Sequence, residues 1–264
     1  MSKTFAIGMA AVALAVAVPA VSLAAEVTAG ADVVSAYIWR GLTYNDGVVV
    51  QPSVDVAHPS GLGLNVWGNF DMTDYDGAVD EREFSEVDLT LSYAVPIEGP
   101  VSITVGISEW LYPKEGNYTP ELPEAHAAVE AKKDTDTREV YLNLGYEPMD
   151  GLALGMSLNQ DIDEVEGTYG DASIAYTYEP CDKTSLEASA RIGVGDKKFA
   201  EYYAGGTKGG LFDWGAKLTA TYALSESTEL GAFVAYTDNL NDDVFPDDAK
   251  DVDVYGGMSL YYTF

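Results

Sequence analysis

The chain has 264 residues, of which 43 are acidic and 14 basic, and its formal net charge at pH 7 is −29. A surface this acidic repels nucleic acid and anionic substrates and attracts cations. Its single cysteine, Cys181, excludes an intramolecular disulfide. After residue 25 no stretch approaches about 18 consecutive apolar residues, so any membrane span must be built from strands.

The first 25 residues have the composition of a secretory signal peptide. Lys3 supplies a positive charge, residues 5–21 form an apolar run, and Ala24 and Ala25 are small residues suited to a cleavage site. A permanent anchor helix is the weaker reading because the apolar run is short. We therefore expect a cleaved signal peptide over residues 1–25 and a mature domain over residues 26–264.

The rest of the chain repeats segments of about ten residues in which apolar and polar residues alternate. A period of two predicts β-strands with one apolar and one polar face. About twelve strands are predicted, an even number that suits an outer-membrane barrel. They cover residues 33–40, 48–58, 62–72, 84–95, 101–111, 139–146, 152–160, 169–178, 186–194, 212–222, 229–236 and 252–264.

The connections between these segments alternate in length. Short links such as residues 59–61 and 147–151 alternate with mostly longer links such as residues 113–138 and 195–211. Outer-membrane barrels have short periplasmic turns and longer outer loops. The sequence therefore predicts an all-β fold, a transmembrane antiparallel β-barrel in the cell outer membrane.

The last predicted strand has the pattern of an assembly signal. Its apolar row ends on a C-terminal phenylalanine, as the final strands of outer-membrane barrels commonly do. The barrel-assembly machinery reads such strands. The residues expected to form this signal are Met258, Leu260, Tyr262 and Phe264.

The two faces of the predicted strands differ in chemistry. Aromatic residues lie on the apolar face near strand ends, as expected for girdles at the two membrane interfaces; they are Tyr37, Trp39, Tyr93, Tyr146, Tyr178, Trp214, Tyr222, Tyr236 and Tyr262. Charged residues fall on the other face, which is mainly acidic. The residues predicted to line a pore are Arg40, Asp55, Asp71, Glu86, Asp88, Trp110, Glu139, Asp171, Glu187, Arg191, Asp213, Lys217, Glu229 and Asp253.

Several segments resemble a known family. Residues 35–41, 51–55 and 60–67 are similar to the opening of the TorF-family porins of proteobacteria, with further similarity at residues 110–113, 139–141, 213–214 and 260–264. The chain departs from that pattern at Ala36 and Ile38, where acidic and basic residues would be expected. The resemblance implies an outer-membrane porin and no particular solute.

Catalytic and metal sites find little support in the residues. The chain has only two histidines, His58 and His126, and neither has an obvious serine and acid partner. Residues 73–77 match part of a calcium loop, but Met72 occupies the first ligand position. Residues 239–251 are also rich in aspartate, and both segments are interpreted as solvated acidic loops. Residues 124–133 favour two helical turns that either narrow the pore or cover its rim.

These patterns predict a monomeric porin for passive diffusion of ions and small polar solutes, without a cofactor, a metal or catalysis. Rings of Asp and Glu favour cations. The expected partners are outer-membrane lipid, the barrel-assembly machinery and small cations or polar solutes, but no nucleic acid. The alternative is a closed structural or surface-interaction barrel whose lumen is filled by its own side chains and whose acidic loops bind cations.

Overall fold

The computed structural model describes residues 25–75, 79–113 and 136–264. The predicted signal peptide, the helical turns at residues 124–133 and His126 lie outside the described residues. Among the residues described, no helix is long and apolar enough to cross a lipid bilayer.

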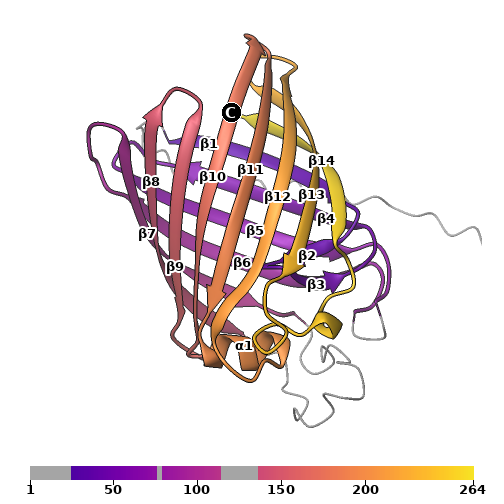
Figure 1. The fold of residues 1–264 in the computed structure, drawn as a ribbon. Coiled ribbons are helices and arrows are strands. Elements are labelled where there is room, and N and C mark those ends of the chain that lie inside the picture. The colour runs from indigo at the N-terminus through magenta and orange to yellow at the C-terminus, as the bar shows by residue number, and fades with distance from the viewer. Residues whose placement is uncertain (1–24, 76–78, 114–135) are drawn as a thin grey trace, which may run out of the picture.

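Twelve strands of the described chain close into an antiparallel barrel (Figure 1). Strand β1 pairs with both β4 and the last strand, β14, so the sheet has no free edge. The fold class predicted from the alternation is confirmed. The strands are β1 Glu26–Val34, β4 Val49–Ala57, β5 Leu62–Asp71, β6 Glu83–Ala94, β7 Val101–Leu111, β8 Thr137–Met149, β9 Leu152–Asp161, β10 Thr168–Cys181, β11 Thr184–Gly195, β12 Gly210–Ala223, β13 Thr228–Asn239 and β14 Val254–Thr263.

The outer face of the barrel is apolar because one row of each strand points away from the lumen. Leu64, Leu91 and Leu218 are 48%, 52% and 60% exposed, far more than a soluble core would allow. Their neighbours along each strand, such as Asn65 and Thr219, point inward. An apolar exterior around a polar interior is the pattern of a barrel that stands in lipid.

The connections sort by length between the two ends of the barrel, apart from those at residues 95–100 and 162–167, which are equally long. Turns at residues 58–61, 150–151 and 182–183 form the short-turn end, near the C-terminus (Figure 1). The opposite, long-loop end carries the connections at residues 35–48, 196–209 and 240–253, with helix α1 (Lys197–Ala204) and the 3-10 helix η2 (Asp247–Ala249). Asp196 caps α1 by accepting a hydrogen bond from the Phe199 amide at 2.8 Å.

The predicted first strand, residues 33–40, is wrong. The first barrel strand is β1, and the chain then forms a hairpin from β2 (Tyr37–Trp39) and β3 (Leu42–Asn45) where an outer loop was expected. Arg40 and Gly41 form its two-residue turn with φ of 49° and 85°, positive at both positions as a type I′ turn requires.

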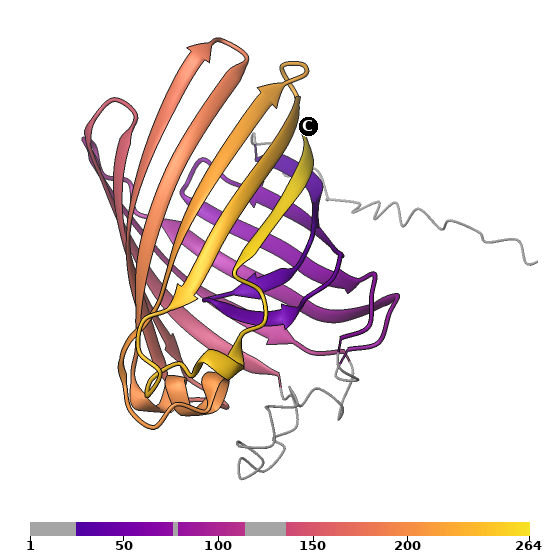
Figure 2. The same ribbon diagram turned by 45° about the vertical axis from the view of Figure 1, so that its right-hand side comes forward.

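The β2–β3 hairpin lies inside the barrel, between opposite walls of the sheet (Figure 2). The assignment of Tyr37 and Trp39 to a lipid-facing girdle is therefore also wrong. Both side chains pack within the lumen, Tyr37 against Trp67 of β5 and Trp39 against Trp110 of β7, with ring centroids 5.7 and 5.1 Å apart.

The apolar core sits at the long-loop end, where the hairpin meets helix α1 and the loop before β14. Leu42 of the hairpin joins Phe199 of α1, Phe212 of β12 and Phe245 of the β13–β14 loop in one buried cluster. Phe212 and Phe245 are stacked with centroids 4.6 Å apart. The long-loop half of the lumen is thus packed like the core of a soluble domain.

Candidate functional site

The hairpin tip is held by an ion pair across the lumen. Arg40 donates two hydrogen bonds to the Glu139 carboxylate of β8, at 2.9 and 2.8 Å. The two side chains are 11% and 7% exposed, so solvent screens the pair little. The guanidinium also lies 4.3 Å from the centre of the Trp39 ring and 4.4 Å from that of Tyr169. Such stacking adds to the attraction because the ring faces are electron-rich.

Two further contacts anchor the hairpin to β6 and β5, which follow β8 and β7 around the barrel. The Tyr37 hydroxyl donates to Glu86 of β6 at 2.7 Å. The Asn45 side-chain amide donates to Asp71 of β5 at 2.8 Å, and Asn69 donates to the same oxygen at 3.0 Å. Acidic residues of the lumen therefore serve first as acceptors that hold the hairpin in place.

A second charged network lies beneath helix α1. Arg191 of β11 donates to the Tyr169 hydroxyl at 2.7 Å and also bonds Asp213, while the Tyr169 hydroxyl donates to Asp213 at 2.8 Å. Asp213 is fully buried, so both of its oxygens need these partners. In helix α1 itself, burial raises the pKa of Tyr203 well above its ordinary value, and its phenol stays neutral at physiological pH.

The short-turn half of the lumen is open to water. Asp55, Glu187 and Glu229 point inward there, from β4, β11 and β13, and Asp55 and Glu229 are exposed. Asp55 accepts a hydrogen bond from Asn65 at 2.8 Å. Three acidic groups on three strands make this vestibule electronegative, and a narrow lumen surrounded by a low-dielectric membrane concentrates the field.

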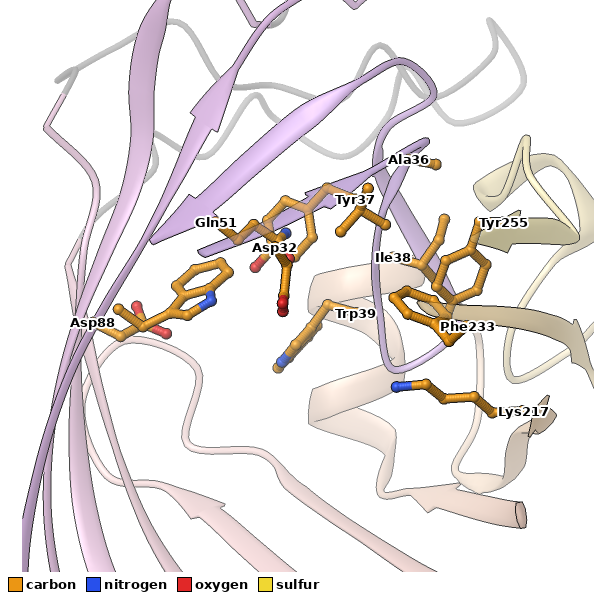
Figure 3. A pocket seen from close by; sticks show the side chains of 12 residues that line it. Asp32, Ala36, Tyr37, Ile38, Trp39, Gln51, Asp88, Lys217, Phe233 and Tyr255 are labelled. Carbon is orange, nitrogen blue, oxygen red and sulfur yellow. The ribbon is translucent and has the colours of Figure 1, made fainter. Parts of the chain in front are cut away.

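A cavity of about 320 Å³ lies between the hairpin and the barrel wall (Figure 3). Its lining combines aromatic, acidic and basic side chains. The residues that line it are Asp32, Val34, Ala36, Tyr37, Ile38, Trp39, Gln51, Trp67, Asp88, Lys217, Phe233 and Tyr255.

The residues described form no group of three or more His, Cys, Asp and Glu that is able to hold a metal ion. His58 lies in the turn between β4 and β5, with its Nδ1 2.7 Å from the Ser60 hydroxyl. Both residues are exposed at the short-turn end.

Comparison with protein families identifies the chain. A family model described as a bacterial protein of unknown function (Gcw_chp) matches residues 20–256. The chain belongs to the Gcw_chp family. No curated protein matches it in sequence.

Solved porins share the fold of this Gcw_chp chain. The KdgM porin is 10% identical with a TM-score of 0.54, over 90% of this chain and 99% of that one. The NanC porin is 9% identical with a TM-score of 0.50, over 90% and 98%. The COG4313 outer membrane channel from Pseudomonas putida F1 is 11% identical with a TM-score of 0.52, over 91% and 94%. At such identities the likeness concerns the fold. These matches agree with a porin-like barrel and do not single out the TorF family, so that resemblance stays a prediction.

The Gcw_chp barrel distributes the predicted lumen residues over three levels. In the long-loop half, Arg40 forms the tip of the hairpin, and the residues around the hairpin and helix α1 are Asp71, Glu86, Asp88, Trp110, Glu139, Arg191 and Asp213. Lys217 lies closer to the short-turn end than Arg191, whereas Asp171, opposite Gly193, lies closer to the long-loop end and accepts a hydrogen bond from Ser157. Asp55, Glu187 and Glu229 line the vestibule. Whether these residues contact a passing solute stays a prediction.

One predicted position differs from the structure. Asp253 does not lie in a strand: it belongs to the loop before β14, is exposed, and accepts a hydrogen bond from Lys250 at 2.5 Å. Lys250 also pairs with Asp238 at 2.9 Å. Asp253 is therefore part of a rim ion-pair network at the long-loop end.

Sequence reasoning missed the residues that the hairpin brings into the lumen. Tyr37, Trp39 and Asn45 were placed in a lipid-facing strand or an outer loop, and Asp32 of β1 was not singled out. A short-range signal existed, since Arg40-Gly41 between two short alternating segments fits a two-residue hairpin turn.

Proposed function

We propose that this chain forms an outer-membrane channel for passive diffusion of cations and small polar solutes. The observation that carries the proposal is the closed barrel whose exterior is apolar and whose water-accessible vestibule is lined by Asp55, Glu187 and Glu229. Acidic groups in a narrow lumen raise the local cation concentration and lower that of anions. The fold shared with solved porins supports the same proposal.

The β2–β3 hairpin sets the size limit of this channel. It occupies the long-loop half of the lumen and is anchored through Glu139 of β8 and Glu86 of β6. Only solutes that fit beside the hairpin pass while it is docked. Passage depends on size and charge, and no residue performs bond chemistry.

The acidic vestibule argues against acidic oligosaccharides as solutes. A solved structure of the KdgM porin holds oligogalacturonate, whose repeated carboxylates make it a polyanion. Asp55, Glu187 and Glu229 would repel such a ligand in the vestibule. We therefore keep cations and small polar solutes as the proposed class.

The proposal also covers how the protein reaches the outer membrane and in which form it acts there. Residues 1–25 direct export as a cleaved signal peptide, and the row of Met258, Leu260, Tyr262 and Phe264 engages the barrel-assembly machinery. The barrel acts as a monomer and requires neither cofactor nor metal.

A closed structural barrel is the second candidate, because one observation favours it. The hairpin, α1 and the β13–β14 loop share a buried apolar cluster that includes Leu42 and Phe245. If that packing never opens, the barrel conducts nothing, and its acidic loops serve as a surface that binds cations or other molecules.

Single-channel recording of the refolded mature protein in a planar bilayer separates the two candidates. The channel proposal expects discrete current steps. Silence at every salt concentration, from protein that shows the heat-modifiable gel migration of a folded barrel, would refute it and leave the closed barrel.

A further inference from the structure

The cavity beside the hairpin has charged groups of opposite sign on opposite walls. Asp32, Gln51 and Asp88 come from β1, β4 and β6 on one side. Lys217 comes from β12 on the other side, next to Phe233 of β13 (Figure 3). A solute in this space meets acceptors at one end and a cationic donor at the other.

Within the described residues, Lys217 and Asp32 form no ion pair, whereas the Asp88 carboxyl group shares a hydrogen bond with that of Glu86. Asp88 Oδ1 is buried and accepts no hydrogen bond from the described chain. Asp32 accepts one hydrogen bond, from the Tyr261 hydroxyl at 3.1 Å. A buried acceptor without a partner is costly unless a ligand or water satisfies it.

Aromatic side chains line the cavity between the acidic and the basic side. Tyr37 and Trp39 from the hairpin lie on the acidic side (Figure 3), and Trp67 from β5 packs against Tyr37. Lys217 Nζ lies 4.2 Å from the centre of the Phe233 ring, which keeps the ammonium at the cavity surface. Aromatic rings beside carboxylates are the surroundings that bind alkylated ammonium groups.

We propose that this cavity is a binding site for a small zwitterion that carries an ammonium and a carboxylate. The ammonium lies against the Asp32 carboxylate and the aromatic faces, and the carboxylate against Lys217. The cavity volume of about 320 Å³ is at the small end of the range for ligand pockets. As a statement of what the channel carries, the inference rests on the proposed function; as a binding site, it is measured without transport.

Titration of tryptophan fluorescence in detergent tests the site, because Trp39 and Trp67 line it. Three probes of similar shape separate the two charges. Glycine betaine has both, choline keeps the quaternary ammonium without the carboxylate, and 3,3-dimethylbutanoate keeps the carboxylate without the ammonium. We expect betaine to bind about tenfold more tightly than either, since choline lacks the carboxylate that accepts from Lys217 and 3,3-dimethylbutanoate lacks the cation attracted by Asp32 and the aromatic faces.

Substitutions then test which protein residue contacts each charged group of the ligand. Lys217→Gln should reduce betaine affinity about tenfold and leave choline unchanged, whereas Asp32→Asn should reduce both betaine and choline. Asp182→Asn and Lys183→Gln make the same chemical changes in the exposed turn between β10 and β11 and should leave betaine binding unchanged.

Three results would overturn the inference: no fluorescence response to betaine, equal affinity for all three probes, or an equal loss in the turn variants. Gel migration confirms that each variant is folded. If a cavity variant does not refold, the order of affinities of the three probes for the unmodified protein tests the inference. Current steps without betaine binding would refute the binding site but leave the channel proposal intact. Betaine binding by a barrel that conducts no current would support the binding site and refute its role in transport.

Discussion

Replacing Glu139 with glutamine should release the hairpin from the lumen and raise the conductance of the channel. Arg40 would then be a buried guanidinium without its carboxylate, which is more costly than losing the pair altogether. Removing one partner of a buried ion pair costs about 3–5 kcal/mol. Glutamine can still accept one hydrogen bond, so we expect the lower end of that range, about a hundredfold in the docking equilibrium.

The chain contains a matched control on the opposite face of the same strand. Arg138 and Glu109 form an equally bidentate pair, at 2.6 and 2.9 Å, which points away from the lumen. Glu109→Gln should leave the single-channel conductance unchanged. The assay is the current per channel in a planar bilayer, together with the fraction of time spent in each level.

A loop replacement extends the same test. Val34 pairs with Val49, so an Asn-Gly turn in place of residues 36–47 can join β1 to β4 without disturbing the barrel. The replacement should give the largest conductance of the series. A conductance equal to that of the unmodified protein, in both this variant and Glu139→Gln, would refute the role of the hairpin as the constriction.

Three further predictions concern the barrel wall, the hairpin turn and the C-terminus. Leu218→Arg, on the outward face, should lower the free energy of unfolding in lipid by about 2–4 kcal/mol, while Thr219→Arg, which points into the lumen, should change it little, as measured by urea titration. Gly41→Ala should weaken docking of the hairpin and raise conductance, because its φ is +85° and an added Cβ would lie 2.8 Å from Asp213 Cβ. Deletion of Phe264 should reduce the amount of assembled barrel in cells but not refolding in detergent, because the side chain is 78% exposed and contributes little to the folded state.

The barrel was predictable because alternation survives in nearly every strand. Strands such as β5 and β14 place polar and apolar residues on opposite faces, and this requires only local sequence. The hairpin was not predictable by the same rule. Tyr37 and Trp39 alternate like lipid-facing residues, but a strand packed inside the lumen presents the same period.

Long-range pairing also lay beyond sequence reasoning. Arg40 and Glu139 are 99 residues apart, and only closure of the barrel brings β8 opposite the hairpin tip. Strand β1 was missed because its alanines and glycine give a weak apolar row. The sequence therefore predicts which polar residues face inward. Only the fold shows which of them hold the hairpin and which line the vestibule.

The reversal potential under a potassium chloride gradient tests the central claim most directly. We predict a cation-selective potential for the unmodified protein. Neutralising the vestibule, in Asp55→Asn/Glu187→Gln/Glu229→Gln, should move that potential toward zero because the acids that concentrate cations are gone. An unchanged potential in the triple variant, or anion selectivity of the unmodified protein, would contradict the account.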